Sequence, residues 1–304
     1  MAGISDEIKN SFKNGTAVVR LIYINLAVFL LLKLIYVLFF LLSPSGGDIA
    51  DKSFRFRENV LVWLMLPSDL QTLLYRPWTI VSYMFLHFEF LHILFNLLFL
   101  FWFGRIFLKY LNEKQLYTTY LLGGLVGAAF FVISYNVFPG LETGPPALGA
   151  SASVTALVMA ISFYAPDYTV YLPFLGPVKL KYLAIVFILL DLLQIPTQNA
   201  GGHIAHLGGA VYGYLFAVQL KRGKDLGKGF SKIADSLAVL FRQRPKMEVS
   251  YKTRAKSMSD SDYNRSKIEH QKEIDSILDK IAKSGYESLS KKEKEILFRM
   301  SNKS

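Results

Sequence analysis

Ser151 and His206 are the residues of this chain best suited to catalyse hydrolysis. Ser151 ends a Gly-Ala-Ser triplet at the start of one short apolar segment, and His206 lies near the start of another. A serine hydroxyl becomes a nucleophile when a base accepts its proton, and neutral imidazole is a suitable base near pH 7. A helix beginning at Ser151 would add free N–H groups for an oxyanion. Taken singly, Ser151 could merely cap its helix and His206 could be a satisfied polar residue.

The two residues are expected at the same depth in a membrane. Ser151 lies 16 residues before Asp167, and His206 lies 15 residues before Lys221; both charges are expected at the cytoplasmic edge. At about 1.5 Å of helix rise per residue, these separations are roughly 24 Å and 22 Å. Both side chains would then lie several ångströms below the outer surface of a hydrocarbon core about 30 Å thick. The protein would have to bring water to them.

His92 and Asn96 form a third polar feature at nearly the same level. They are four residues apart, on one face of a helix, and His92 lies 13 residues before Arg105, roughly 20 Å. Both side chains can donate hydrogen bonds, which suits an oxyanion hole completed by the backbone N–H of Ser151. An interhelical polar clamp is the alternative. Convergence of three polar features on one depth favours an active site.

Small residues would let the two helices that carry the serine and the histidine approach each other closely. Gly209 and Gly213 follow His206 at helical spacing, and Ala152 and Ala156 form a small-residue stripe on the other segment. Such faces allow close helix packing in bilayers. The approach would bring the serine within hydrogen-bond reach of His206.

The composition indicates an integral membrane protein. The chain has 304 residues, of which 52% are hydrophobic and 24 are Phe, and a mean hydropathy of +0.33. The fold class expected is an all-α membrane bundle of six transmembrane helices, with a small soluble helical hairpin at the C-terminal end. The expected spans are residues 18–42, 82–104, 115–138, 151–166, 180–196 and 203–220. The absence of Cys excludes disulfides and a thiol nucleophile.

Basic residues predict the orientation and the domain boundaries. Lys and Arg flank alternate ends of the spans, whereas the loops 139–150 and 197–202 contain neither, so both termini are expected on the cytoplasmic side. Only the long first loop departs from this pattern. The predicted segments are a cytoplasmic N-terminal segment (1–17), a six-helix membrane domain (18–220), a basic flexible linker (221–265) and a cytoplasmic helical hairpin (266–304). The first span is too long for a cleavable signal peptide and is expected to be an anchor.

The tail from Lys221 onward carries most of the positive charge. It holds 21 Lys and Arg against 12 Asp and Glu, a net +9 of the formal +11. An apolar stripe of Ile268, Ile274, Ile277, Leu278 and Ile281 predicts one helix ending at Gly285, and Ser288-Leu289-Ser290 with Glu293 resembles the cap of a second. The tail contains no recognised nucleic-acid-binding motif, so nucleic acid is not an expected partner. No partner of the hairpin is identified.

At this point the sequence resembles a known family, the rhomboid intramembrane serine proteases. The residues that carry the resemblance are His92 to Asn96, Gly149-Ala150-Ser151, and His206 with Gly209 and Gly213, in the family's order. The resemblance implies a Ser-His dyad without an acidic third member, with Ser151 as nucleophile and His206 as general base and then acid. It implies His92 and Asn96 as oxyanion donors, and Gly149, Gly209 and Gly213 as packing support. His87 has a counterpart in many members and is interpreted as structural or water-organising.

The resemblance also implies partners. The expected substrates are single-pass transmembrane proteins, cut inside the lipid bilayer near the extracytoplasmic end of a helix, with no metal and no cofactor. The sequence shows no organelle-targeting presequence, so the expected location is a bacterial cytoplasmic membrane. Three positions depart from the family: Ala152 replaces the usual Gly after the serine, Thr155 replaces an aromatic that stacks on the histidine, and Trp78 is not followed by Arg.

Three other functions remain as alternatives. The first is a catalytically silent rhomboid-like protein that binds membrane clients for quality control. The second is a transporter or channel, although the two halves show no inverted repeat. The third is a metalloprotease, because His203 and His206 are three residues apart; the sequence has no His-Glu-x-x-His motif and no carboxylate that is evidently well placed.

Two charges are expected deep in the membrane. Asp191 lies 10 residues beyond Lys181, and Lys33 lies 13 beyond Arg20, roughly 15 Å and 20 Å into the bilayer. Charges at such depth pair, face the bundle interior or snorkel. One hypothesis is an ion pair between Lys33 and Asp191; the alternative is that the first span is shifted and Lys33 snorkels.

Overall fold

The computed structural model describes residues 3–43, 48–141, 144–172, 176–197, 199–241 and 260–295. The chain divides into two compact units, Met1–Arg242 and Gln243–Ser304. Each unit is described by itself below.

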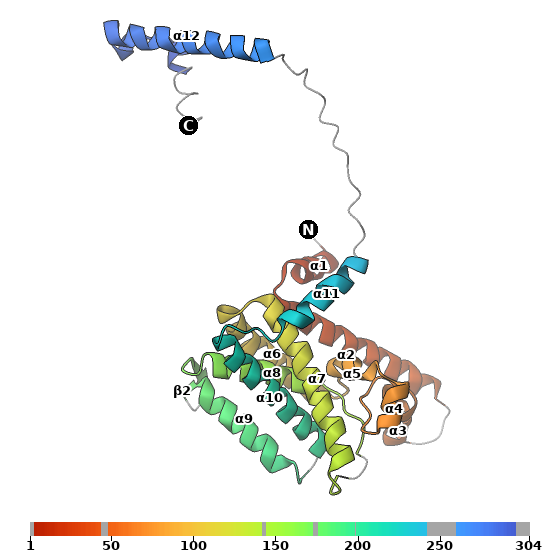
Figure 1. The fold of residues 1–304 in the computed structure, drawn as a ribbon. Helices are drawn as coiled ribbons and strands as arrows, with labels where there is room; N and C mark the ends of the chain where they lie inside the picture. Colours follow the sequence, from red (N-terminus) through yellow and green to blue (C-terminus); the bar gives the residue numbers. More distant parts are fainter. Residues whose placement is uncertain are drawn as a thin grey trace. The chain divides into compact units, whose positions relative to one another are not determined.

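Helices build nearly all of the first unit (Figure 1). Six helices of its described part overlap the predicted spans: α2 (Ala17–Leu42), α6 (Phe90–Tyr110), α7 (Glu113–Val137), α8 (Ser151–Tyr164), α9 (Leu180–Gln194) and α10 (Ala200–Lys221). The outer helices are α1 (Ile4–Asn14) at the start and α11 (Lys228–Phe241) at the end. The predicted all-α membrane bundle is confirmed, and the chain is an integral membrane protein.

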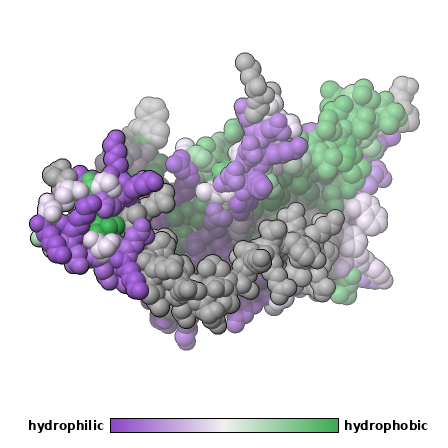
Figure 2. Space-filling model, turned by 90° about the horizontal axis from the view of Figure 1, so that it is seen from above, coloured by the Kyte–Doolittle hydropathy of each residue, from purple (hydrophilic) through white to green (hydrophobic). Residues whose placement is uncertain are grey.

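Three of these helices, α2, α6 and α7, are long and apolar enough to cross a membrane. Leucines of α2 such as Leu34 and Leu41 are exposed on the surface of the unit, at 64% and 70%. Figure 2 shows hydrophobic residues gathered into a broad area of the molecular surface. Such a surface is unfavourable in water, where large exposed apolar patches mark membrane or partner contacts, and it suits a hydrocarbon environment.

Helix α8 lies at the centre of the bundle. It packs against α6, α7, α9 and α10, and most of its side chains are buried. Its 14 residues are too few to cross a bilayer about 30 Å thick at 1.5 Å per residue. A short helix with an irregular loop before it is tolerated at membrane depth because the surrounding protein buries both.

The segment between α2 and α6 is folded rather than an open loop. It contains α3 (Ile49–Asn59), η1 (Leu61–Trp63), α4 (Leu70–Tyr75), α5 (Thr79–Ser82) and η2 (Tyr83–Phe85). Phe56, Leu61 and Met65 from this segment form a small core with Leu32 of α2 and Leu86. The second predicted span was placed too early, because residues 79–85 form short helices and Leu86 turns the chain before α6 begins at Phe90. Tyr83 and Met84 of this segment are instead buried in a core with Ala128 of α7 and Ala152 of α8.

Two further elements were not predicted. Strands β1 (Thr169–Leu172) and β2 (Gly176–Lys179) pair antiparallel between α8 and α9. Helix α11 occupies part of the segment 221–265 that was expected to be a flexible linker, because Ile233, Ala234, Leu237 and Leu240 recur there at helical spacing. The division into four segments otherwise stays a prediction, and residues 242–259 of the linker lie outside the described residues.

The second unit contains α12 (Asp260–Ser284) and η3 (Tyr286–Ser288). Gly285 follows α12 with a φ of 73° and a ψ of 164°, a conformation that glycine adopts readily because it has no Cβ. Ile277 is buried as the predicted stripe requires, whereas Leu278 is 50% exposed and does not belong to it. The amide of Ser290 donates to Glu293 Oε2, and the amide of Glu293 donates to Ser290 Oγ, so the predicted helix cap is present. Most of the second helix lies outside the described residues.

Candidate active site

Ser151 is the first residue of α8, and four hydrogen bonds fix the loop that leads to it. Leu66 and Ala147 form an isolated antiparallel bridge. The amide of Gly149 donates to the Tyr83 carbonyl at 2.9 Å. The amide of Ala150 donates to Nε2 of His87 at 3.3 Å. The buried His87 therefore contacts the chain one residue before the serine.

Glycine is the residue type that fits at position 149, beside the serine. Its φ is 129°, which L side chains rarely adopt. A Cβ there would also lie 2.7 Å from Cε1 and 2.8 Å from Nε2 of His92. Any side chain would therefore push the His92 ring away from Ser151.

The backbone amides at the start of α8 have no acceptor among the described hydrogen bonds, so this end of the helix is suited to bind an anion. The first amide of this helix that bonds to a preceding carbonyl is that of Val154, which donates to Ala150. Among the described hydrogen bonds, the amides of Ser151, Ala152 and Ser153 have no acceptor. Free N–H groups and the positive end of the helix dipole favour an anion at this position.

Helix α10 brings His206 to the same place through close packing against α8. A Cβ on Gly209 would collide with the carbonyl oxygen of Ala152, and one on Gly213 would collide with the carbonyl oxygen of Ala156. The two helix backbones are therefore in direct contact. The methyl group of Ala152 fits because Gly127 of α7 faces it, where an added Cβ would lie 2.6 Å away.

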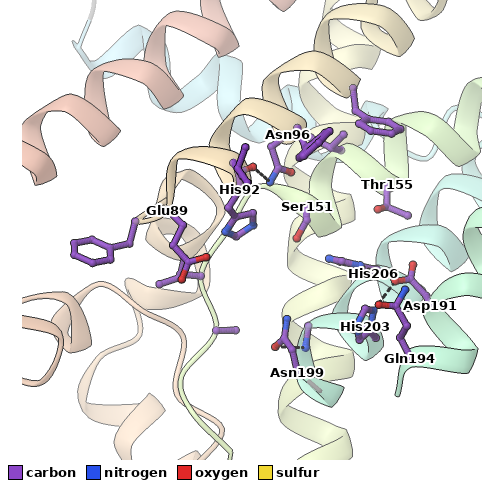
Figure 3. A pocket seen from close by; sticks show the side chains of 18 of the residues that line it. Glu89, His92, Asn96, Ser151, Thr155, Asp191, Gln194, Asn199, His203 and His206 are labelled. Atoms are coloured by element: carbon purple, nitrogen blue, oxygen red, sulfur yellow. Dashed lines mark hydrogen bonds and ion pairs between the residues drawn. The ribbon is translucent and has the colours of Figure 1, made fainter. Parts of the chain in front are cut away.

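Ser151 and His206 face each other across a cavity of about 750 Å³ (Figure 3). The Ser151 hydroxyl points toward the imidazole ring, although the hydrogen bonds of the described residues do not include one between them. Such bonds are often long in a substrate-free active site and tighten with substrate. Polar residues from α6, α8, α9 and α10 line the cavity: His92, Asn96, Ser151, Thr155, Asp191, Gln194, His203 and His206.

His92 and Asn96 of α6 form the wall next to the serine (Figure 3). Asn96 is 7% exposed, and its Nδ2 donates to the His92 carbonyl at 2.9 Å. The second hydrogen of that amide stays available to a ligand. The His92 ring is in edge contact with the His87 ring, with a centroid separation of 5.0 Å. The structure thus brings together all four residues that the sequence selected for catalysis and oxyanion binding.

Asp191 is the site residue whose place the sequence did not reveal. Its Oδ1 is 2.8 Å from Nδ1 of His203 and 2.9 Å from Nδ1 of His206. The hypothesis of an ion pair with Lys33 is wrong: the Lys33 ammonium lies over the Phe88 ring, 4.0 Å from its centre. Helix α9 packs mainly against α8 and α10, and Asp191 is bonded to the two histidines of α10 instead.

The expectation that no carboxylate lies near the two histidines is also wrong. Ligand atoms of Asp191, His203 and His206 lie within 4.8 Å of one another. Two imidazoles and a carboxylate could bind a divalent metal ion such as Zn²⁺. The two separations of 2.8 and 2.9 Å are those of hydrogen bonds, and they account for the cluster without a metal.

The fold and this cavity define a class: a helical membrane protein with a serine and a histidine facing each other inside the bundle. The family model described as Rhomboid domain matches residues 75–223. These residues contain α6 to α10 and all residues that line the cavity except Arg57 and Leu61. This part of the chain is therefore similar to the rhomboid family. A second model, described as a family of unknown function (DUF6576), matches residues 259–303.

Several curated proteins are similar to part of this chain. The RHOMBOID-like protein 12, mitochondrial, of Arabidopsis thaliana is 30% identical over 161 residues, which cover 49% of this chain and 48% of that protein. Rhomboid protease GlpG of Yersinia pseudotuberculosis is 32% identical over 161 residues, and that of Yersinia enterocolitica is 35% identical over 162 residues. Each of these alignments covers 52% of this chain and 53% of the relative. The chain thus spans about half the length of the curated relatives it matches.

Proposed function

We propose that this chain is an intramembrane serine protease that hydrolyses peptide bonds in or near transmembrane helices of single-pass membrane proteins. The observation that carries the proposal is the meeting of Ser151, His206, His92 and Asn96 in one cavity at the start of α8. The names of the two Yersinia relatives, both rhomboid proteases, support it. A packing role alone would not require four polar side chains to meet around a cavity.

Acylation begins when Ser151 Oγ attacks the carbonyl carbon of the scissile peptide bond. His206 Nε2 accepts the hydroxyl proton as the new C–O bond forms. The resulting tetrahedral intermediate collapses, the C–N bond breaks, and His206 returns the proton to the leaving amine. The acyl group then remains on Ser151 as an ester.

The oxyanion of the tetrahedral intermediate would form at the start of α8. The amides of Ser151 and Ala152 are free there, and the side chains of His92 and Asn96, in the wall next to the serine, would donate to the same oxygen. These donors are fixed before substrate arrives, since Asn96 is held by its bond to the His92 carbonyl. Donors fixed in advance stabilise charge without reorganisation during the reaction.

Deacylation requires water inside the bundle. The cavity carries polar groups of Gln194 and Asn199 beside the two α10 histidines, and a polar, roomy cavity can hold water. His206 would take a proton from this water as its oxygen attacks the ester, and then return the proton to Ser151 Oγ. Hydrolysis thus regenerates the free enzyme.

The location of the site sets the place of cleavage. With both termini on the cytoplasmic side of a bacterial inner membrane, as the basic residues favour, the start of α8 lies below the extracytoplasmic surface. A substrate helix would then be cut near its extracytoplasmic end, where it must unwind to enter the cavity.

The experiment is cleavage of a single-pass reporter whose outer juxtamembrane segment is rich in Ala and destabilises the helix. The parent protein in liposomes should cut this reporter, and Ser151→Ala and His206→Ala should each lower kcat at least about 10³-fold. Thermal unfolding in the same detergent would show that both variants remain folded.

The competing function is that of a catalytically silent protein that binds membrane clients. It would be favoured if the parent cut neither this reporter nor a panel of others but retained them in a pull-down. Cleavage that persisted equally in all three proteins would instead overturn the Ser151–His206 assignment.

A further inference from the structure

We propose that Asp191 positions the catalytic histidine, so that the site works as a Ser-His-Asp triad rather than as a dyad. This inference rests on the proposed function, because it assigns a role to His206 in the same reaction. The observation that carries it is the 2.9 Å contact between Asp191 Oδ1 and His206 Nδ1, on the side of the ring that does not face Ser151 (Figure 3).

The contact joins two helices at the wall of the cavity. Asp191 lies on α9 and His206 on α10, and their side chains are only 14% and 22% exposed. A hydrogen bond in such a partly dry setting is stronger than one in water and holds its partners in place. Asp191 therefore sits where it can orient the ring from the wall of the active site.

The chemistry of a carboxylate decides which nitrogen of His206 carries the proton. An ionised carboxylate only accepts hydrogen bonds, so Nδ1 of His206 must be the donor. The lone pair of the neutral ring is then on Nε2, the atom that must take the proton of Ser151. Without Asp191, the ring could adopt the other tautomer, whose Nε2 already carries a hydrogen and accepts no proton.

The same carboxylate would act during the reaction. When Nε2 accepts the Ser151 proton, the ring becomes an imidazolium with a positive charge 2.9 Å from Asp191. The carboxylate stabilises this charge and keeps its own ionised form, while the proton on Nε2 goes on to the leaving amine. Asp191 itself neither gains nor loses a proton.

Other contacts of the ring do not fix its orientation equally well. Thr155 lies across the cavity from His206 and has no aromatic face for the ring to stack on (Figure 3). The His203 ring touches it edge-on, with centroids 5.7 Å apart and an interplanar angle of 84°. Among the described residues, Asp191 makes the one hydrogen bond to the His206 ring.

His203 shares the same carboxylate oxygen, at 2.8 Å. It lies one turn before His206 on α10, so its bond holds the Asp191 side chain toward that helix. We expect His203→Gln to weaken activity less than Asp191→Asn, because the carboxylate stays and can still accept from His206. Comparing the two variants separates the effect of orienting His206, which needs the carboxylate, from the effect of packing α9 against α10, which both variants disturb.

The kinetic experiment compares Asp191→Asn, Asp191→Glu and the matched control Asp167→Asn in full-length protein. Asp167 is also an aspartate, but it is exposed and pairs with Lys179 and Lys181 outside the cavity. Asp191→Asn should lower kcat and the rate of Ser151 modification by a fluorophosphonate about 10²- to 10⁴-fold, with KM within about twofold of the parent. Asp191→Glu should restore part of the rate, and Asp167→Asn should behave as the parent.

A second measurement tests the inference without any activity. The chain has five histidines, so a ¹⁵N-histidine NMR spectrum is simple, and the His206→Ala protein identifies the signals of His206. The parent should show His206 protonated on Nδ1, and Asp191→Asn should show a mixture of the two tautomers. A parent that fails to cut reporters but has this Nδ1 signal would argue against the protease and leave the positioning by Asp191 intact.

Three results would overturn the inference. The first is equal kcat in an active parent and Asp191→Asn. The second is a loss of activity in Asp191→Asn that appears as a raised KM and a lowered melting temperature, as expected for a structural contact. The third is a parent whose activity disappears on chelation and returns with Zn²⁺, which would assign Asp191, His203 and His206 to a metal site.

Discussion

Asn96 and Asn59 make the same local hydrogen bond in different places. Each donates from Nδ2 to the carbonyl four residues earlier on its own helix, at 2.9 Å and 2.7 Å. Asn96 faces the cavity, whereas Asn59 lies on the exposed side of α3. A difference in activity between Asn96→Ala and Asn59→Ala would therefore come from the second amide hydrogen of Asn96, which is free to bind a ligand in the cavity.

We predict that Asn96→Ala lowers kcat about 10²- to 10³-fold, the usual effect of removing one oxyanion donor. KM should change little, because the donor acts mainly on the transition state. Steady-state cleavage of the reporter measures both constants. Asn59→Ala is the control and should match the parent; equal losses in the two variants would contradict the oxyanion role.

At the level of single residues, much of the candidate site could be predicted from the sequence. Counting helix rise from flanking charges placed Ser151, His206 and His92 at one depth, and these residues do line one cavity. The partner of Asp191 could not be found in this way. The count gives the depth of a residue but not the direction its helix faces, and α9 turns Asp191 toward α10 rather than toward Lys33.

At the level of elements, the pairing of α8 with α10 positions the site. Gly209 and Gly213 let the two helix backbones touch. Ser151, at the start of α8, and His206, near the start of α10, are thereby brought to the same cavity. Gly229 on α11 is a matched control, because an added Cβ there meets nothing within 4 Å. Replacing either glycine by alanine raises helix propensity by the same amount. The difference in unfolding free energy between Gly209→Ala and Gly229→Ala therefore measures the effect of the clash with Ala152.

We predict that Gly209→Ala lowers the free energy of unfolding by about 1–3 kcal/mol, the usual cost of overpacking. Gly229→Ala should be neutral or slightly stabilising. Unfolding of both variants in detergent, followed by circular dichroism, measures the difference. A Gly209→Ala protein as stable as Gly229→Ala would show that α8 and α10 are not in backbone contact.

The cap in the second unit has its own pH dependence. Hydrogen bonds from the Ser290 amide and hydroxyl, together with the Lys280 ammonium, lower the pKa of Glu293 to about 2. Because the folded pKa lies below the unfolded one, this stabilisation is fully present above the ordinary glutamate value. It is lost as the pH falls through the folded pKa.

We predict that a ¹³C NMR titration of the full chain, compared with Glu293→Gln, shows one glutamate carboxyl with a pKa near 2. The comparison assigns the signal, since it disappears in the variant. A carboxyl of Glu293 that titrates at the ordinary glutamate value would contradict the capping box and the Lys280 contact.

The elements themselves were predictable to different degrees. The six long apolar stretches predicted α2 and α6 to α10 because their length and hydropathy are intrinsic to the sequence. The start of α6 was not predictable, because residues 79–85 are as apolar as a span and only tertiary packing bends them into short helices. The β1–β2 pair follows from contacts between two short extended runs, which helical periodicity does not detect.

For the molecule as a whole, the account requires one orientation in the membrane. The chain contains no Cys, so single cysteines can report which side each loop faces. Gly140, between α7 and α8, and Gly229, on α11, both have open space for a side chain. The two positions lie on predicted opposite sides of the bilayer.

We predict that Gly140→Cys reacts with a membrane-impermeant maleimide in intact cells and that Gly229→Cys reacts only after the membrane is opened. The unmodified chain is the blank. The reverse pattern would place the start of α8 near the cytoplasmic surface and would contradict cleavage at the extracytoplasmic end of substrates.

The central claim is that Ser151 is a nucleophile activated by His206. The most direct measurement is to treat the full-length protein with a fluorophosphonate and map the adduct by mass spectrometry. The account predicts one adduct, on Ser151, in the parent, and none in His206→Ala under the same conditions. An adduct on another residue, or a parent that cuts the reporter without any adduct on Ser151, would contradict it.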